Sequence, residues 1–466
     1  MHIKSIAQAF LSAEVNFMKK YELNMCDGSI IKGIALFSIP LVMSGILQLL
    51  FNAADIIVVG RFDGQTAMAA VGSTSSLINL LINIFIGYSA GASVVISRYF
   101  GANDKKGMER AVSTCVATAA IFGIGLMIIG FILARRLLLL MDSPADVIDE
   151  ATIYMKIYFI GMPGFMLYNF GSGILRAIGD TKRPLVFLTA AGIVNVILNL
   201  IFVIIFKMGV AGVAIATSVS QAISAVCVII CLIKSKESYR IDPKNIRIYG
   251  SEFKMMTKIG LPTGIQGSMF SISNVIIQSA VNRFGSTIMA GSTAASNIEG
   301  FVYCVLNGIS QGMLTFTGQN YGAKKLQRIK KGLYVCIGLE IGVVLSISAL
   351  VVFFARPLLS IYSKDAPVID AGVTRLTVIC LTYFLCGLNE TVVAFLRGLG
   401  YSFGPMVISV FAICILRIVY IKTIFKSFMT LDALFVSYPI SWFIAFAVNG
   451  VLAVFVWKHL NKSFDN

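Results

Sequence analysis

The sequence is poor in charge and almost without histidine. Only 13% of its 466 residues are Asp, Glu, Lys or Arg, and 57% are hydrophobic, whereas soluble domains carry about 25% charged residues. The two histidines, His2 and His459, lie outside every long apolar stretch, so histidine cannot serve as a proton carrier inside a membrane here. This composition excludes a soluble globular protein and predicts a polytopic membrane protein.

Motifs for metal binding, catalysis and ATP hydrolysis are also missing. The nine cysteines include no Cys-x-x-Cys pair and mostly fall in apolar stretches, so we expect packing residues rather than disulfides or metal ligands. The sequence has no HExxH motif, no cluster of histidines, and no GxxxxGK followed by Ser or Thr. These absences argue against a membrane-embedded enzyme and against ATP as the direct energy source. No bound cofactor is expected.

Twelve apolar stretches are long enough to cross a bilayer as helices. The longest polar segment between them is 234–254, and no loop is large enough for a soluble catalytic domain. The predicted fold is therefore an all-α membrane protein with twelve transmembrane helices. The expected spans are 34–59, 68–97, 111–134, 150–174, 184–206, 210–233, 255–282, 290–320, 332–355, 368–395, 404–425 and 432–457.

Basic residues indicate how these spans are oriented. The net charge of +16 comes from Lys and Arg in short loops, so it sets topology and does not indicate nucleic-acid binding. These residues gather at both ends of the chain and in the loops after even-numbered spans, which predicts that both termini are cytoplasmic. We expect a cytoplasmic N-terminal segment 1–33, a linker 234–254 and a tail 458–466, in a multi-pass protein of the cell membrane.

A second methionine lies a short way into the chain. Met18 opens the stretch MKKYELNMCDGSIIKG, which would serve as a start by itself. We expect residues 1–17 to be an upstream extension of little consequence. Loss of transport in a chain that starts at Met18 would refute this expectation.

The two halves of the chain repeat one another. At one constant offset the first half overlays the second at several Gly, Arg and Pro positions: Gly179 falls on Gly400, and Pro184 falls on Pro405. Each repeat holds six spans, an even number, so the copies have the same orientation and a pseudo-two-fold axis along the membrane normal. We therefore expect two six-helix bundles, residues 34–233 and 255–457, which alternate access by rocking.

Asp55 is a carboxylate within the first apolar stretch, IALFSIPLVMSGILQLLFNAADIIVV at 34–59. At about 1.5 Å per residue this stretch runs about 39 Å as a helix, enough to cross the hydrocarbon core with some tilt. A charge inside a span costs at least about 2.5–3.5 kcal/mol, so such residues commonly bind an ion, a proton or a substrate. The alternative is a charge at the helix end that contacts lipid headgroups, because Gly60 and Arg61 follow closely.

Several motifs together identify a family. They are SIPLVMSGILQLLFNAADIIVVGRF in span 1, SRYFGANDKK after span 2, LYNFGSGILRAIGDTKRPL from span 4 into span 5, GVAGVAIATSVSQ opening span 6, and FTGQNYGAKK after span 8. With these motifs, the chain resembles the multidrug and toxic compound extrusion family of secondary transporters over nearly all of residues 28–460. The resemblance implies export of organic cations and other amphipathic compounds, driven by inward Na⁺ or H⁺.

The resemblance also implies a coupling site. Asp55 matches the first-span acid of the family, Asn195 an asparagine near that acid, and Thr217 a polar residue of the same pocket. Asn199 falls where some members carry a second aspartate, which puts a mechanism based on a coupled acid pair in doubt. One carboxylate, two amides and a hydroxyl suit Na⁺, and they suit a proton-titrating acid equally well.

The second half offers candidates for a substrate cavity or a gate. Glu299 resembles a glutamate common in span 8 of the family, and a structural hydrogen bond to a neighbouring helix is its alternative role. Glu390 lies two helical turns before Arg397, so an ion pair, a gate contact or an ion site are all open. Some members of the family carry an acid on span 7, whereas span 7 here offers only amides and hydroxyls, Gln278 among them. Glu340 lies mid-span without a recognised motif, and we assign it no role.

The expected function is therefore cation-coupled export of an amphipathic or cationic small molecule by a monomer in the lipid bilayer. A flippase for a lipid-linked saccharide is the alternative, but it would need a large basic cavity, and only three Lys or Arg lie within the spans. A passive channel is also conceivable, although the six-plus-six repeat favours alternating access. The sequence does not choose between Na⁺ and H⁺.

Overall fold

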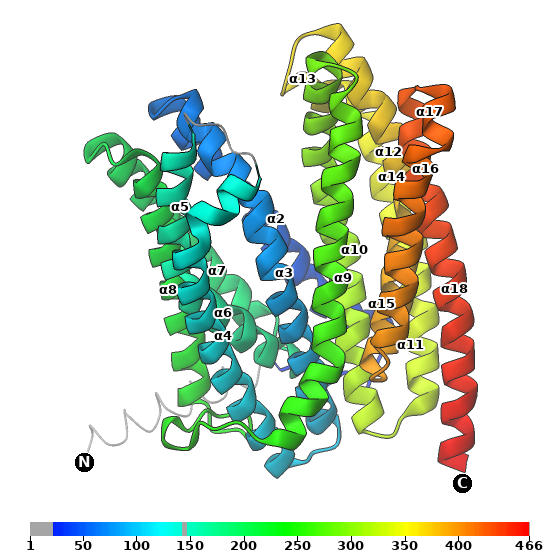
Figure 1. The fold of residues 1–466 in the computed structure, drawn as a ribbon. Helices are drawn as coiled ribbons and strands as arrows, with labels where there is room; N and C mark the ends of the chain where they lie inside the picture. Colours follow the sequence, from blue (N-terminus) through cyan, green and yellow to red (C-terminus); the bar gives the residue numbers. More distant parts are fainter. Residues whose placement is uncertain (1–21, 142–146, 466) are drawn as a thin grey trace. The chain divides into compact units, whose positions relative to one another are not determined.

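The computed structural model describes residues 22–141 and 147–465, which form helices joined by short connections, with no strand in these ranges (Figure 1). The proposed extension 1–17 lies outside the described residues. Nine of the described helices are long and apolar enough to cross a membrane, so the chain is a multi-pass helical membrane protein. They are Ile30–Phe62, Ala70–Gly101, Lys105–Leu140, Lys182–Ile205, Gly209–Lys234, Leu326–Phe353, Ala366–Gly398, Phe403–Phe428 and Leu431–Lys462.

Most of the predicted spans coincide with single α-helices. Two of these are α9 (Gly250–Asn282) and α10 (Ser286–Gly322). Both are long, but their many amides and hydroxyls lower their mean hydropathy, so they are not among the nine apolar helices above. The other uninterrupted helices are α2 (Ile30–Phe62), α3 (Gln65–Gly101), α4 (Lys105–Leu140), α8 (Gly209–Lys234), α14 (Ala366–Gly398) and α18 (Leu431–Asp465).

The predicted span 150–174 is broken in two. Helix α5 (Ile148–Ile160) ends before Gly161, and α6 (Met162–Ala177) begins with Pro163 in its first turn. Proline has no N–H to donate to the preceding turn, so a new helix begins where the old one would lose a hydrogen bond. The two short helices together cover the predicted range.

Three further spans contain a π-helical segment, in which the hydrogen bonds run to the fifth residue. Such segments are rare and often lie at functional sites. Helix α7 (Lys182–Leu200) continues into η1 (Ile201–Ile205). The other two composites are α11 (Leu326–Leu339), η3 (Glu340–Val344) and α12 (Leu345–Phe353), and α15 (Phe403–Ser409), η4 (Val410–Ile415) and α16 (Leu416–Lys422). The short elements η2 (Pro243–Asn245), α13 (Ala355–Ser360) and α17 (Ile424–Phe428) complete the described fold.

The chain folds into two compact units. Unit 1 holds the described residues up to Gly28, with Leu47–Ile78 and Ser89–Thr257. Unit 2 holds Ser29–Ile46, Asn79–Tyr88 and the chain from Lys258 onward. Helices α2 and α3 therefore contribute residues to both units.

Each unit is packed through small residues and aromatic rings. In unit 1, a Cβ added at Gly130 on α4 would lie 2.2 Å from the ring of Phe159 on α5, so only glycine admits this ring. In unit 2, the rings of Tyr383 on α14 and Trp442 on α18 stack with centroids 5.2 Å apart. Trp442 belongs, with Phe435, to the buried hydrophobic core of this unit, and Tyr383 packs against that core. Close contacts of this kind replace the hydrophobic driving force that is weak in lipid.

Backbone conformation repeats between the halves of the chain. The left-handed turn residues Asn103 and Lys324 have φ of 53° and 58°, and Gly179 and Gly400 have φ of 90° and 85°. Both pairs are separated by the same offset that relates the two halves in sequence. Helices α3 and α10, 37 residues each, start and end at positions related by this offset as well. The internal repeat therefore extends from sequence to local structure.

Candidate functional site

Asp55 on α2 contacts polar side chains from two other helices of unit 1. Asn199 on α7 donates its Nδ2 to Asp55 Oδ1 at 2.5 Å, and Thr217 on α8 donates its hydroxyl to Asp55 Oδ2 at 3.4 Å. Asn199 Nδ2 also contacts Asn195 Oδ1 at 3.3 Å, and Asn195 Nδ2 contacts the Thr217 hydroxyl at 3.4 Å. The structure thus brings together all four residues that the sequence suggested for ion coupling, in one closed ring of contacts.

Helix periodicity explains why two asparagines can share this ring. Asn195 and Asn199 are four residues apart on α7, so both project from the same face. Their side chains are deeply buried, with 4% and 0% of the residue exposed. Asn199 Oδ1 has no hydrogen-bond partner among the described residues. A buried acceptor without a donor is unusual, so the ring has an oxygen to spare for a ligand.

The side chains that hydrogen-bond to Asp55 in the described residues are neutral. Among the described residues, no Lys or Arg forms an ion pair with it. Tyr154 and Tyr158 on α5 lie close enough to Asp55 for an electrostatic interaction between its carboxylate and their hydroxyls. A carboxylate surrounded by amides and hydroxyls can take up a proton or can act with the neighbouring oxygens as a ligand for a hard cation.

Unit 2 contains a cavity of about 510 Å³. Glu299, Gln278 and Glu390, the residues suggested for a substrate cavity or a gate, all lie in its wall. Aromatic rings, among them Tyr438 and Trp442, form other parts of the wall. Its volume falls within the range of about 300–1,000 Å³ that is usual for small-molecule sites.

Glu299 on α10 forms a two-pronged ion pair with Arg375 on α14. Arg375 Nε lies 2.7 Å from Glu299 Oε1 and Nη2 lies 2.9 Å from Oε2, while Nη1 donates to the Ser292 hydroxyl at 2.7 Å. This planar fork is the strongest arrangement of an arginine and a carboxylate. The contact to a neighbouring helix that we considered for Glu299 is therefore present, as an ion pair.

Glu390 and Arg397 do not form an ion pair among the described residues. Arg397 Nη2 donates instead to Gln266 Oε1 on α9 at 2.8 Å. Gln278, also on α9, donates its side-chain Nε2 to Asn282 at 3.0 Å. Glu390 therefore lies in the cavity wall without an ion-pair partner in residues 22–141 and 147–465.

Glu340 is the first residue of the π-helical segment η3 and is fully buried. The Thr391 hydroxyl on α14 donates to its Oε1 at 3.1 Å, and its Oε2 has no hydrogen-bond partner among the described residues. Gly387, one turn before Thr391, lies against this carboxyl group: a Cβ there would be 2.2 Å from Oε2. The side chain is thus fixed between η3 and α14.

Sequence reasoning missed the partners of two candidate acids. Arg375 is one of the three basic residues within the predicted spans, and the sequence does not indicate its contact with Glu299 because the two residues lie far apart in the chain. Tyr154 and Tyr158, four residues apart near the start of a span, were not singled out. Their spacing places both on one helix face, which was the available signal.

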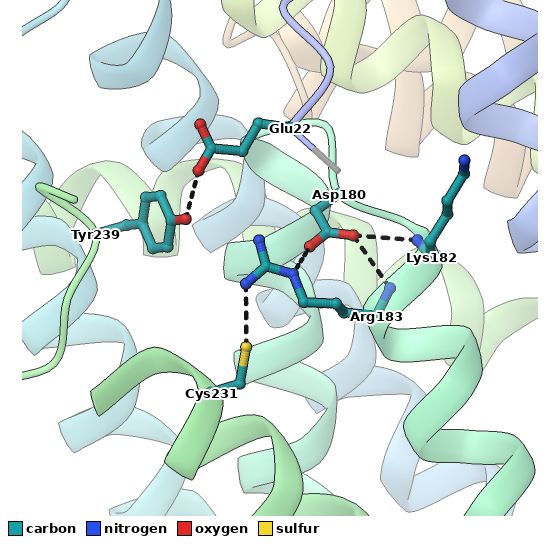
Figure 2. Close-up of polar contacts among 6 residues, drawn as sticks. All are labelled: Glu22, Asp180, Lys182, Arg183, Cys231 and Tyr239. Carbon is teal, nitrogen blue, oxygen red and sulfur yellow. Dashed lines mark hydrogen bonds and ion pairs between the residues drawn. The ribbon is translucent and has the colours of Figure 1, made fainter. Parts of the chain in front are cut away.

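A second polar cluster fixes the chain just before α2 to unit 1 (Figure 2). The Tyr239 hydroxyl donates to Glu22 Oε1 at 2.6 Å. Asp180 accepts from the backbone N–H of Arg183 at 3.1 Å and pairs with the Arg183 side chain, whose Nη1 contacts Cys231 Sγ at 3.3 Å. Burial raises the pKa of Glu22 and of Asp180, although the Tyr239 hydroxyl opposes the shift at Glu22 and Arg183 opposes it at Asp180.

Gly179 completes this cluster. It lies in the turn after α6 with φ of 90°, a conformation that side chains other than glycine's rarely adopt. A Cβ at this position would also lie 2.2 Å from the carbonyl oxygen of Leu23. Glycine is therefore required twice, for the turn and for the close approach of the N-terminal segment.

Comparison with known proteins agrees with this architecture. The family model MatE matches residues 40–201 and 262–421. The Bacillus subtilis (strain 168) protein named "Probable multidrug resistance protein YoeA" is 29% identical, over 92% of this chain and 95% of its own length. "Probable multidrug resistance protein NorM" of Thermotoga maritima is 24% identical, over 86% of each chain.

A solved structure has the same fold. It is described as the outward-facing conformation of a multidrug resistance MATE family transporter of the MOP superfamily, and it superposes with a TM-score of 0.88 at 22% identity, over 95% of this chain and 99% of its own. The family model matches both halves of the chain and covers well over half of it. The chain therefore belongs to the MatE family of multidrug and toxic compound extrusion transporters.

Proposed function

We propose that this transporter exports organic cations or other amphipathic drugs by alternating access, in exchange for inward Na⁺ or H⁺. The names of its curated relatives, multidrug resistance proteins, support a drug-like substrate. An ion gradient as the energy source is supported by the sequence, which has no nucleotide-binding motif of the GxxxxGK type.

The observation that carries the proposal is the ring around Asp55. A carboxylate within a span, held by one amide and one hydroxyl and with no basic partner among the described residues, is costly unless it is used. Asn199 and Thr217 hold one carboxylate oxygen each, so both oxygens are oriented before an ion arrives. Asp55, Asn195, Asn199 and Thr217 are the proposed coupling residues.

Binding of Na⁺ or H⁺ would change the net charge of the four-residue ring from negative to neutral, because Asp55 is its only charged member. A neutral ring no longer needs the donors of Asn199 and Thr217 in their present positions, so α2, α7 and α8 can move relative to one another. We propose that this local rearrangement favours one access state of the transporter, and that drug binding favours the other. The wall residues Glu299, Gln278 and Glu390 of the unit 2 cavity are proposed to contribute to substrate binding or gating.

The proposed arrangement of the twelve spans follows from the internal repeat. Residues 34–233 and 255–457 would form six-helix bundles related by a pseudo-two-fold axis along the membrane normal, with twelve spans in all. The linker 234–254, the N-terminal segment 1–33 and the tail 458–466 would be cytoplasmic, as the distribution of basic residues indicates. One monomer would then hold a complete transport pathway.

Ethidium efflux from proteoliposomes tests the function and separates the two ions. The full chain is reconstituted with an inward Na⁺ gradient, an inward H⁺ gradient, or neither. We expect efflux with one gradient and none without, because the ion must supply the energy. The spare oxygen of Asn199 favours Na⁺, and efflux driven by the pH gradient alone would assign H⁺ instead.

Asp55→Asn is the decisive variant, because it keeps the shape of the side chain and removes its charge. We expect its efflux to fall to the level without a gradient while the protein stays monodisperse. Asp149→Asn is the matched control, since Asp149 is an exposed acid of the same unit, and it should transport normally. Normal gradient-driven efflux by Asp55→Asn would refute the site, and efflux without either gradient would refute coupling.

A further inference from the structure

Two arginines line the unit 2 cavity, and they differ in how their charge is compensated. Arg375 and Arg417 both lie in its wall and both are buried. Burying a guanidinium is expensive unless a carboxylate or other strong acceptor compensates it. The partners of each arginine therefore show whether its own charge is compensated by an adjacent carboxylate.

The charge of Arg375 is cancelled within the protein. The Glu299 carboxylate accepts two hydrogen bonds from the Arg375 guanidinium, and the Ser292 hydroxyl accepts a third. A carboxylate from outside would have to compete with Glu299 for an arginine that is held in this way. Arg375 and Glu299 together contribute no net charge to the cavity.

The charge of Arg417 is not cancelled by any carboxylate that the structure describes. Only 2% of this residue is exposed, and its Nε and Nη2 share one neutral acceptor, the Ser441 hydroxyl, at 3.2 and 2.6 Å. Nη1 has no hydrogen-bond partner in the described part of the chain, and no carboxylate there lies within ion-pair distance. Glu390, the other acid in the wall, is not paired with it.

Two aromatic rings also lie against Arg417. Its guanidinium carbon lies 4.1 Å from the centre of the Tyr438 ring and 6.0 Å from that of Trp442. Tyr383 extends this aromatic group by stacking on Trp442, with the two ring centroids 5.2 Å apart. Cation–π contacts of this kind orient a guanidinium but leave its positive charge in place.

We propose that the unit 2 cavity is a binding site for amphipathic aromatic carboxylates, zwitterions included, and that Arg417 binds the carboxylate. The guanidinium has an N–H edge free for a second acceptor, and an arginine fork matches the geometry of a carboxylate. The rings of Tyr438 and Trp442 would contact the aromatic part of the ligand. This inference rests on the proposed export function, because it names a class of substrate.

Equilibrium binding tests the site without any ion gradient. The chain has two tryptophans, and one of them, Trp442, lies in the cavity wall. In a Trp457→Phe background, Trp442 fluorescence of the purified full chain reports cavity binding alone. The probes are 2-naphthoate and the neutral 2-naphthamide, which have nearly the same shape.

We expect naphthoate to bind about 10- to 100-fold more tightly than naphthamide, the gain typical of a hydrogen bond to a charged group. In Arg417→Gln this preference should disappear, and in Arg417→Lys it should be reduced because the ammonium lacks the fork. Arg356→Gln, which removes an exposed arginine outside the cavity, should keep the full preference. Size-exclusion profiles establish that each variant is folded.

Equal affinity of the wild-type cavity for both probes would overturn the proposal even if no Arg417 variant folds. An unchanged preference for naphthoate in a folded Arg417→Gln would overturn it as well. The result does not depend on coupling, because no gradient is applied. A transporter that binds naphthoate through Arg417 but fails to export ethidium would refute the proposed function and keep this site.

Discussion

Arg135 pairs with Asp149 at 2.6 Å, and the same pair recurs at the equivalent positions of the second half, where Arg356 lies 2.7 Å from Asp370. The first pair joins α4 to α5 and the second joins α13 to α14, so each pair links consecutive helices in its half of the chain. All four side chains are more than half exposed. The repeat therefore reaches individual side-chain contacts, including contacts that add little stability.

Exposed pairs of this kind should be almost neutral. For Arg135→Gln and Arg356→Gln we expect the free energy of unfolding to fall by about 0–1 kcal/mol, because solvent and salt screen such charges. Chemical denaturation of the purified chain measures this value. A loss well above that range in either variant would show that the pair is protected from water in the folded protein.

The pair between Arg110 and Glu252 should matter more. Arg110 Nε lies 3.0 Å from Glu252 Oε1, and the Glu252 side chain is 1% exposed while that of Arg110 is 46% exposed. Arg110→Gln leaves the buried carboxylate without its cation, which we expect to cost about 1–3 kcal/mol, less than for a fully buried pair because water reaches the arginine. The same denaturation experiment, with Arg135→Gln as the reference, checks the difference. Equal losses in the two variants would contradict it.

Removing Asn199 should weaken ion coupling without unfolding unit 1. Asn199→Ala deletes the donor to Asp55 Oδ1 and the spare Oδ1 acceptor, so we expect the concentration of coupling ion for half-maximal ethidium efflux to rise about 10- to 100-fold. Asn169→Ala is the matched control, because within the described part of the chain the Asn169 amide donates only to the backbone of its own helix. The prediction fails if both variants need the same ion concentration as the wild type.

Sequence reasoning found the residues around Asp55 because the local signals were strong. A lone acid in an apolar stretch is conspicuous, and two asparagines four residues apart must share a helix face. Their contacts with Asp55 and Thr217 cross between helices, and here the family resemblance supplied what periodicity could not. The break before Pro163 also had a local signal, since proline disfavours the helix interior.

Contacts between distant helices were not predictable in the same way. Glu299 was a candidate by itself, but its partner Arg375 lies on another helix, and hydropathy does not specify which faces meet. The π-helical segments η1, η3 and η4 were missed because they insert within continuous apolar stretches whose composition does not change. Helices α9 and α10 are long enough to cross a membrane, but their polar residues lower their mean hydropathy below that of the nine apolar helices.

Docking of the N-terminal segment should depend on pH through Glu22. Burial raises the pKa of Glu22 above its ordinary value of 4.5, even though the Tyr239 hydroxyl stabilises the charged form. The folded state therefore holds this proton more tightly than the unfolded chain does. Docking should be strongest below pH 4.5 and should weaken as pH rises through the raised pKa. Hydrogen exchange of residues 22–28, corrected for the intrinsic exchange rate, measures the strength of this docking.

Glu22→Gln provides the control for this pH dependence. The amide cannot ionise but can still accept from Tyr239, so its exchange should stay slow and independent of pH. Tyr239→Phe should speed exchange at high pH, where the charged carboxylate loses its donor. If Glu22→Gln shows the same pH profile as the wild type, another group, for example the neighbouring Asp180, controls docking.

Glu340 and Gly387 should be energetically coupled, because the glycine leaves the space that the carboxyl group occupies. In Gly387→Ala the new methyl group would lie 2.2 Å from Glu340 Oε2 and 2.8 Å from Cδ, so Glu340 must move away from the Thr391 hydroxyl. We expect a loss of about 1–3 kcal/mol, as for other overpacked interiors. Glu340→Ala removes the clashing group, so the double variant should be more stable than the sum of the single losses predicts, by about 0.5–3 kcal/mol. Denaturation of the four proteins of this cycle measures the coupling, and strict additivity would show that the carboxyl group can turn aside at no cost.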